Sequence, residues 1–199
     1  MKKTLKIAAA VLAFLCFAAY LIFEMSKQPI NSDGACMLLE AQDILSGNVL
    51  LSDWHLTGVS FLTTDLPWFV LAVSLFGVTL RAYYFACISM YLFMVICAVP
   101  LVFYKVRDRL WAMLALFGIG LIPTTYALSH SFVHTAVFAL SFLALYFAAR
   151  YADSPSRKNL TVFCVLTALA VCGDRLGFVL IVRPLVIIAS IGGVQKRLG

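Results

Sequence analysis

Residues 82–104 read AYYFACISMYLFMVICAVPLVFY, a stretch without a single charged side chain. An α-helix needs about 20 apolar residues to cross the hydrocarbon core of a bilayer, so this segment predicts a transmembrane helix. The other apolar segments of comparable character lie at 7–23, 110–128, 132–149, 160–172 and 176–191. The sequence therefore predicts an all-α fold, a polytopic transmembrane helix bundle of about six spans that forms one membrane domain over residues 1–199.

The composition of the whole chain supports this interpretation. Of its 199 residues 63% are hydrophobic and 12% are charged, whereas a soluble domain is about 45–50% apolar and about 25% charged. The net charge of +6 could suggest nucleic acid, but the basic residues form short clusters beside apolar spans rather than one basic face. We therefore expect membrane lipid as a partner and no nucleic acid.

The basic clusters also predict the topology. They are Lys2, Lys3 and Lys6, then Lys105, Arg107 and Arg109, then Arg157 and Lys158, and finally Lys196 and Arg197. Such clusters mark cytoplasmic ends of spans, which predicts a multi-pass protein of the plasma membrane with a cytoplasmic N-terminus. Segment 7–23 is too long for a signal-peptide core and is expected to remain as the first span. The loop 24–81 is then extracytoplasmic, and segment 67–80 is too short to cross.

Within this loop the sequence predicts amphipathic helices beside the membrane. Ser32 or Asp33 can cap a helix, and Gly47 can end it. Its apolar positions leave Glu40 and Asp43 for water, so we expect the helix to lie on the membrane surface.

Asp33 is the first candidate for chemistry, because a carboxylate at an apolar boundary can have its pKa raised and act as a general base. The alternative is that Asp33 only caps the helix. Asp33 and Asp43 are also weak candidate ligands for a divalent metal ion. Ten residues of helix span about 15 Å, so the two carboxylates could share an ion only if the helix bent.

Five further residues outside the membrane could contact a substrate. His130 and His134 are four residues apart, so one continuous helix would place both on one face. Asp174 and Arg175 lie between two short apolar segments, either in a wet cavity or in a plain turn. Arg81 could hold a phosphate, or could extend to the membrane interface.

Several of these positions together resemble the N-terminal part of the C-type (GT-C) polytopic membrane glycosyltransferases, the group of the protein mannosyltransferases and aminoarabinose transferases. The matching positions are Asp33-Gly34-Ala35 after the first span, Gly47-Asn48, Trp54, Phe76-Gly77, Arg81 and the turn Cys172-Gly173-Asp174-Arg175-Leu176. Many members of that family have a second acidic residue directly after the first, where this chain has Gly34.

The resemblance implies transfer of a sugar from a polyprenyl-phosphate donor to an extracytoplasmic acceptor. It implies that Asp33 is the catalytic base and that His130, His134, Asp174, Arg175 and Arg81 bind substrate. Family members are usually longer, so two alternatives stay open: an active enzyme, or a form truncated after about residue 190 and inactive. A small transporter subunit, for which Arg183 inside a span would be the feature, and a noncatalytic scaffold are the alternatives from other classes.

Overall fold

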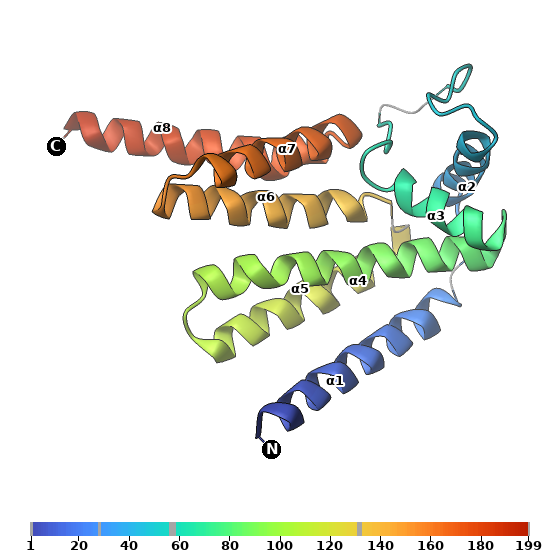
Figure 1. Ribbon diagram of the computed structural model, residues 1–199, viewed down its shortest axis with the longest axis horizontal. Coiled ribbons are helices and arrows are strands. Elements are labelled where there is room, and N and C mark those ends of the chain that lie inside the picture. Colours follow the sequence, from blue (N-terminus) through green and yellow to red (C-terminus); the bar gives the residue numbers. More distant parts are fainter. Residues whose placement is uncertain (1, 28, 56–58, 131–132, 199) are drawn as a thin grey trace.

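The computed structural model describes residues 2–27, 29–55, 59–130 and 133–198, and within these ranges every regular element is a helix and no strand occurs. The side chains of helical residues 2–7, 9–10, 121–130 and 191–198 are not described. In chain order (Figure 1) the elements are α1 (Lys2–Met25), α2 (Ser32–Leu45), α3 (Leu66–Phe76), α4 (Leu80–Lys105), α5 (Arg109–His130), α6 (Thr135–Asp153), α7 (Arg157–Gly173), the π-helical turn η1 (Phe178–Val182) and α8 (Arg183–Leu198). The predicted all-α class is confirmed.

The long helices run roughly alongside one another, and α2 and α3 cover one end of the bundle (Figure 1). Helix α4 packs against α6, α5 and α1, while α6 packs against α7 and η1. Alanines at 82, 86 and 98 in α4 and at 136, 139 and 144 in α6 are almost fully buried. Small side chains let helix backbones approach closely, which is the packing that membrane bundles use in place of a large apolar core.

Two of the described helices, α4 and α6, are long and apolar enough to cross a bilayer. The other apolar helical segments are shorter where their side chains are described: Val11–Met25, Leu66–Phe76, Arg109–Gly120 and Phe178–Ser190. Helix α3 has 11 residues, a rise of about 16 Å, which is about half of the hydrocarbon thickness. The expected helix in 67–80 is therefore present and is too short to span.

Helix α2 corrects two sequence predictions. Its N-cap is Asn31, whose Oδ1 accepts the Gly34 N–H at 2.9 Å, so neither Ser32 nor Asp33 is the cap. Glu40 was expected to face water but is 9% exposed, and burial raises its pKa to about 7. The reason for the second difference is that α2 packs against both α3 and α4, so more than one of its faces is covered.

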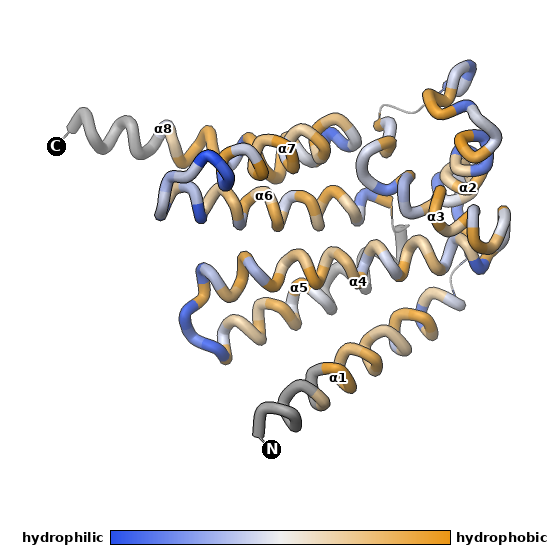
Figure 2. The backbone as a smooth tube through the Cα atoms, viewed as in Figure 1, coloured by the Kyte–Doolittle hydropathy of each residue, from blue (hydrophilic) through white to orange (hydrophobic). Residues whose placement is uncertain are grey.

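The two ends of the bundle differ in charge, and polar segments mark both ends in Figure 2. The α4–α5 and α6–α7 connections and the adjoining helix ends carry six cations: Lys105, Arg107, Arg109, Arg150, Arg157 and Lys158. Seven of the nine acidic residues lie in the segments at the opposite end, near α2 and α3: Glu24, Asp33, Glu40, Asp43, Asp53, Asp65 and Asp174. The bundle is therefore polarised, with a basic end and an acidic end.

The contact between α2 and α4 depends on the absence of a side chain at Gly34. A Cβ placed there would lie 2.3 Å from Cε2 of Tyr83, a ring that is almost fully buried in α4. We predict that Gly34→Ala lowers the free energy of unfolding by about 1–3 kcal/mol, because the ring has little room to move. The thermal midpoint in detergent measures this, with Gly120→Ala in α5 as the control, because an added Cβ there would meet Phe17 at 3.5 Å, an ordinary contact. An unchanged midpoint for Gly34→Ala would contradict the predicted overlap.

Candidate functional site

The loop before α3 is fixed to the C-terminal end of α7 at the acidic end of the bundle. Three donors of the loop bond to carbonyl groups in the last turn of α7: Phe61 N–H to Gly173 at 2.9 Å, Thr63 Oγ1 to Leu169 at 2.6 Å and Ser60 Oγ to Cys172 at 3.2 Å. The carbonyl groups of Cys172 and Gly173 lie in the last turn and have no partner within the helix, so the loop satisfies two groups that would otherwise need water. These bonds place residues 60–65 beside Asp174.

His134 lies between α5 and α6 in a left-handed conformation, with φ of 77°. It is the N-cap residue of α6, but its side chain makes no capping bond. Its Nδ1 instead pairs with Oδ2 of Asp174 at 2.5 Å, and the edge of its ring lies against Phe61 with the ring centroids 4.9 Å apart. This corrects the expected helical pair of His130 and His134: α5 ends at His130, and a residue with positive φ cannot continue it.

Asp174 is buried and uses both of its carboxylate oxygens. Oδ2 pairs with His134, and Oδ1 accepts the backbone N–H of Leu176 at 2.9 Å. The bond to Asp174 raises the pKa of His134, and burial of the imidazole acts in the opposite direction. The pair therefore favours the charged form of His134, and the buried carboxylate holds the imidazole ring in place. Its Nε2 is the ring nitrogen that remains available to a substrate.

Asp65 is a second buried carboxylate of the site. It is the N-cap residue of α3 but makes no capping bond there; its Oδ1 accepts the Ala136 N–H in the first turn of α6 at 3.3 Å. Its Oδ2 is buried without a hydrogen-bond partner among the described residues. Burial raises the pKa of Asp65 to about 6. Asp65, from the start of α3, therefore accepts a backbone N–H in the first turn of α6 and acts as its cap. The N-cap residue His134 does not do so, because its side chain pairs with Asp174.

Asp33 lies in the first turn of α2 with an exposed side chain. Its carboxylate is close enough to act electrostatically on His134 and raises the pKa of that residue. Because Asn31 is the cap, the carboxylate of Asp33 is not used to start the helix. The predicted base and the histidine of the site are thus at the same end of the bundle.

The remaining predicted residues are dispersed. Arg175 is exposed directly after Asp174, and Arg81 is exposed in the first turn of α4. The side chain of His130 lies outside the described residues. No described contact joins either arginine to His134.

Asp43 has a structural role. Its Oδ2 accepts bonds from Asn48 Nδ2 at 2.6 Å and Trp54 Nε1 at 2.9 Å, which fold the loop after α2 back onto the helix. Asp33 and Asp43 lie in one continuous helix and cannot meet at one ion, so they do not fit a shared metal. Within the described ranges, no three His, Cys, Asp or Glu side chains gather as metal ligands.

Asp65 is the functional candidate that the sequence analysis missed. It had a local signal, an acidic residue directly before the apolar helix Leu66-Pro67-Trp68 with proline in its first turn. That signal usually means an N-cap, and nothing in it reveals that the carboxylate bonds to a helix 71 residues away in the chain.

The site combines an exposed carboxylate, an imidazole whose pKa is raised and two buried carboxylates. Such a set can accept a proton through Asp33 and hold a phosphate oxygen through Nε2 of His134. Comparison of the chain with family models, with curated proteins and with solved structures finds no match. The functional assignment therefore depends on this geometry and on the residues that carry the resemblance.

The burial of Asp65 predicts a pH-dependent stability. Its pKa rises from 3.8 to about 6 on folding, so the folded state holds the proton longer and wild-type stability falls as pH rises from about 4 to about 6. At 1.36 kcal/mol per unit the loss is on the order of 3 kcal/mol. We predict that Asp65→Asn, which keeps the acceptor for Ala136, gains stability relative to wild type between pH 4 and pH 8, measured as thermal midpoints in detergent.

The control is Asp53→Asn, an exposed left-handed loop residue where asparagine fits equally well. The thermal midpoints of Asp65→Asn and wild type could differ by the same amount at pH 4 and at pH 8. That result would show that the pKa of Asp65 is not raised.

Proposed function

We propose that this chain is a membrane-embedded transferase of the C-type glycosyltransferase kind, which moves a sugar from a polyprenyl-phosphate donor to a hydroxyl group of an extracytoplasmic acceptor. The observation that carries the proposal is the His134–Asp174 pair beside Asp65 and Asp33 at the acidic end of the bundle. A lipid-linked donor needs such a site at the end of membrane helices, where its phosphate leaves the hydrocarbon region.

The proposed topology has six spans, α1, α4, α5, α6, α7 and η1–α8, with the N-terminus in the cytoplasm of a cell whose plasma membrane holds the protein. The position of the basic residues supports it, because both described basic connections are at one end and the site is at the other. Exposed apolar side chains along the helices, such as Phe23, Trp111 and Phe117, also support contact with lipid.

In the proposed reaction Asp33 removes the proton of the acceptor hydroxyl, whose oxygen attacks the anomeric carbon of the donor. The new carbon–oxygen bond forms as the bond between the anomeric carbon and the phosphate oxygen breaks, and the polyprenyl phosphate leaves. The imidazolium of His134, oriented by Asp174, offsets the charge that develops on the leaving phosphate. Asp174 and Asp65 act as positioning residues, since both bond to the segment that carries His134.

Sugar transfer in membranes tests the assignment of the base. Membranes containing the full chain are supplied with radiolabelled polyprenyl-phosphate sugars, and loss of label from the lipid fraction is measured. We predict that Asp33→Asn lowers the rate by about 10²–10⁴-fold, the usual contribution of a general base. Asp53→Asn, an exposed carboxylate in the same loop, is the matched control and should keep the wild-type rate. Donor consumption that is absent in wild type, or equal in Asp33→Asn, would refute the proposed activity.

The role of His134 predicts the alkaline limit of the reaction. Because its pKa is raised above 6.5, the imidazolium persists to higher pH and activity should fall only as pH rises through that raised value. We predict that Asp174→Asn moves this alkaline limit to lower pH, since the bond that favours the charged form is weakened. The measurement is the transfer rate against pH for wild type and Asp174→Asn. An unchanged limit with a lower maximum would mean that Asp174 has only a structural role.

A further inference from the structure

A second polar cluster lies at the basic end of the bundle, where α4 and α6 both end. The Tyr104 hydroxyl donates to Oδ2 of Asp153 at 2.7 Å, and Nζ of Lys105 pairs with the same oxygen at 3.2 Å. The ring of Tyr104 meets that of Tyr146 edge to face, with centroids 5.6 Å apart and an interplanar angle of 86°. The proposed transfer reaction uses none of these residues.

Arg150 is oriented by this pair of tyrosines. Its NH1 donates to the Tyr146 hydroxyl at 3.0 Å, and its guanidinium carbon lies 6.0 Å and 5.8 Å from the ring centroids of Tyr104 and Tyr146. Nζ of Lys105 lies 5.0 Å from the centroid of the same Tyr104 ring. Two cations are thus gathered around one tyrosine, and the tyrosines hold the guanidinium in position.

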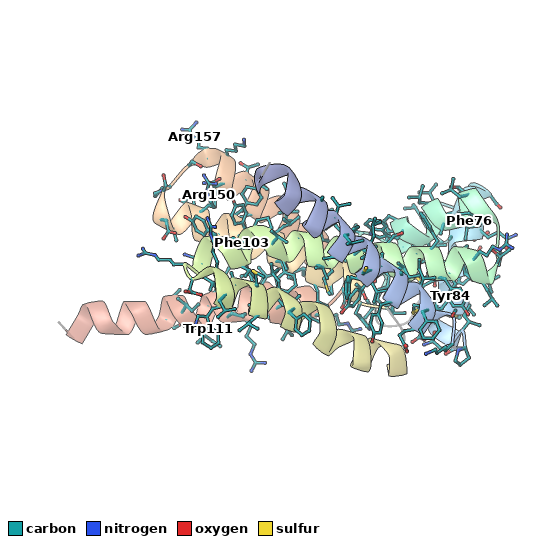
Figure 3. The ribbon with its side chains drawn as sticks, turned by 90° about the horizontal axis from the view of Figure 1, so that it is seen from below. Phe76, Tyr84, Phe103, Trp111, Arg150 and Arg157 are labelled. Atoms are coloured by element: carbon teal, nitrogen blue, oxygen red, sulfur yellow. The ribbon has the colours of Figure 1, made fainter. Side chains whose placement is uncertain are left out.

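The charge of this cluster is not balanced by the acidic residues near it. Asp153 is occupied by Tyr104 and Lys105, and Asp108 caps α5 by accepting the N–H groups of Leu110 and Trp111. No ion pair of Arg150 or Arg157 occurs within the described parts of the chain. Both arginine side chains are exposed at this end of the molecule (Figure 3). An anion that approached would find a guanidinium with free donors.

An apolar surface leads from the cluster along α4. Ile96, Val99 and Phe103 are exposed at a spacing of three and four residues, which places them on one face of the helix next to Tyr104. A free phosphate ion would gain nothing from this surface, whereas an acyl chain would lie along it. The combination of a cation-rich end with an apolar helix face fits a lipid rather than a soluble anion.

We propose that Arg150, Lys105, Tyr104 and Tyr146 form a binding site for the headgroup of an anionic phospholipid, with an acyl chain along Ile96, Val99 and Phe103. The guanidinium of Arg150 contacts the phosphodiester, and the tyrosines lie at the boundary between headgroups and hydrocarbon. The site is independent of sugar transfer, so it can hold or fail whatever the outcome at Asp33.

Native mass spectrometry of the full chain in detergent tests this proposal with phosphatidylglycerol and phosphatidylcholine in equal amounts. Wild type should retain phosphatidylglycerol in preference, and Arg150→Ala should lower that preference about fivefold, the contribution of one cation near an anionic headgroup. Tyr146→Phe keeps the ring and removes the acceptor of Arg150, so it should give a smaller decrease. Lys27→Ala, which removes an exposed cation at the opposite end, is the control and should keep the wild-type preference.

Three outcomes would overturn the proposal. The first is an equal preference for the two lipids in wild type, and the second is an equal loss in Lys27→Ala and Arg150→Ala, which would indicate a general charge effect. The third is complete displacement of phosphatidylglycerol by excess inorganic phosphate, which would identify a site for free phosphate. Circular dichroism of each variant establishes that the helices are intact.

Discussion

The bond between His134 and Asp174 connects two helix ends that lie 40 residues apart in the chain, and the acidic end of the bundle is organised around it. Asp174 can reach His134 only because α6 begins at Thr135, after a residue in a left-handed conformation. Once the imidazole is turned toward Asp174 it cannot cap α6, so Asp65 supplies that acceptor from the start of α3. The loop before α3 is then held against the last turn of α7.

This arrangement of helix ends lowers the stability of the folded protein, and the effect arises mainly at Asp65. A fully buried carboxylate with one unpartnered oxygen opposes folding at neutral pH. A neutral amide at this position could accept the same N–H of α6 at a smaller desolvation cost. Chains keep such groups where charge is useful to function rather than to stability. Asp174, Asp65 and Asp33 all raise the pKa of the same imidazole, and the largest contribution is the hydrogen bond between His134 and Asp174.

The sequence was sufficient for the elements that depend on local pattern. The apolar segment 82–104 became α4, and α2 ends at Leu45, shortly before Gly47, which has the positive φ that glycine adopts easily. The pairings across the fold could not be predicted from spacing. Glu40 is buried because two helices cover α2, and Asp65 joins the site because α3 ends up against the start of α6. Both facts depend on tertiary packing, which no local pattern in one sequence encodes.

The packing of Tyr83 against Gly34 also bears on how this chain can diverge. In the C-type transferases proposed as its relatives, the first acidic residue is often followed by a second, and here the volume that the second side chain would need is filled by the ring of Tyr83. A substitution of Gly34 by an acidic residue is therefore open only after position 83 has changed to a smaller residue. Positions 34 and 83 are therefore coupled. Tyr83 must be replaced by a smaller residue before an acidic side chain can fit at position 34.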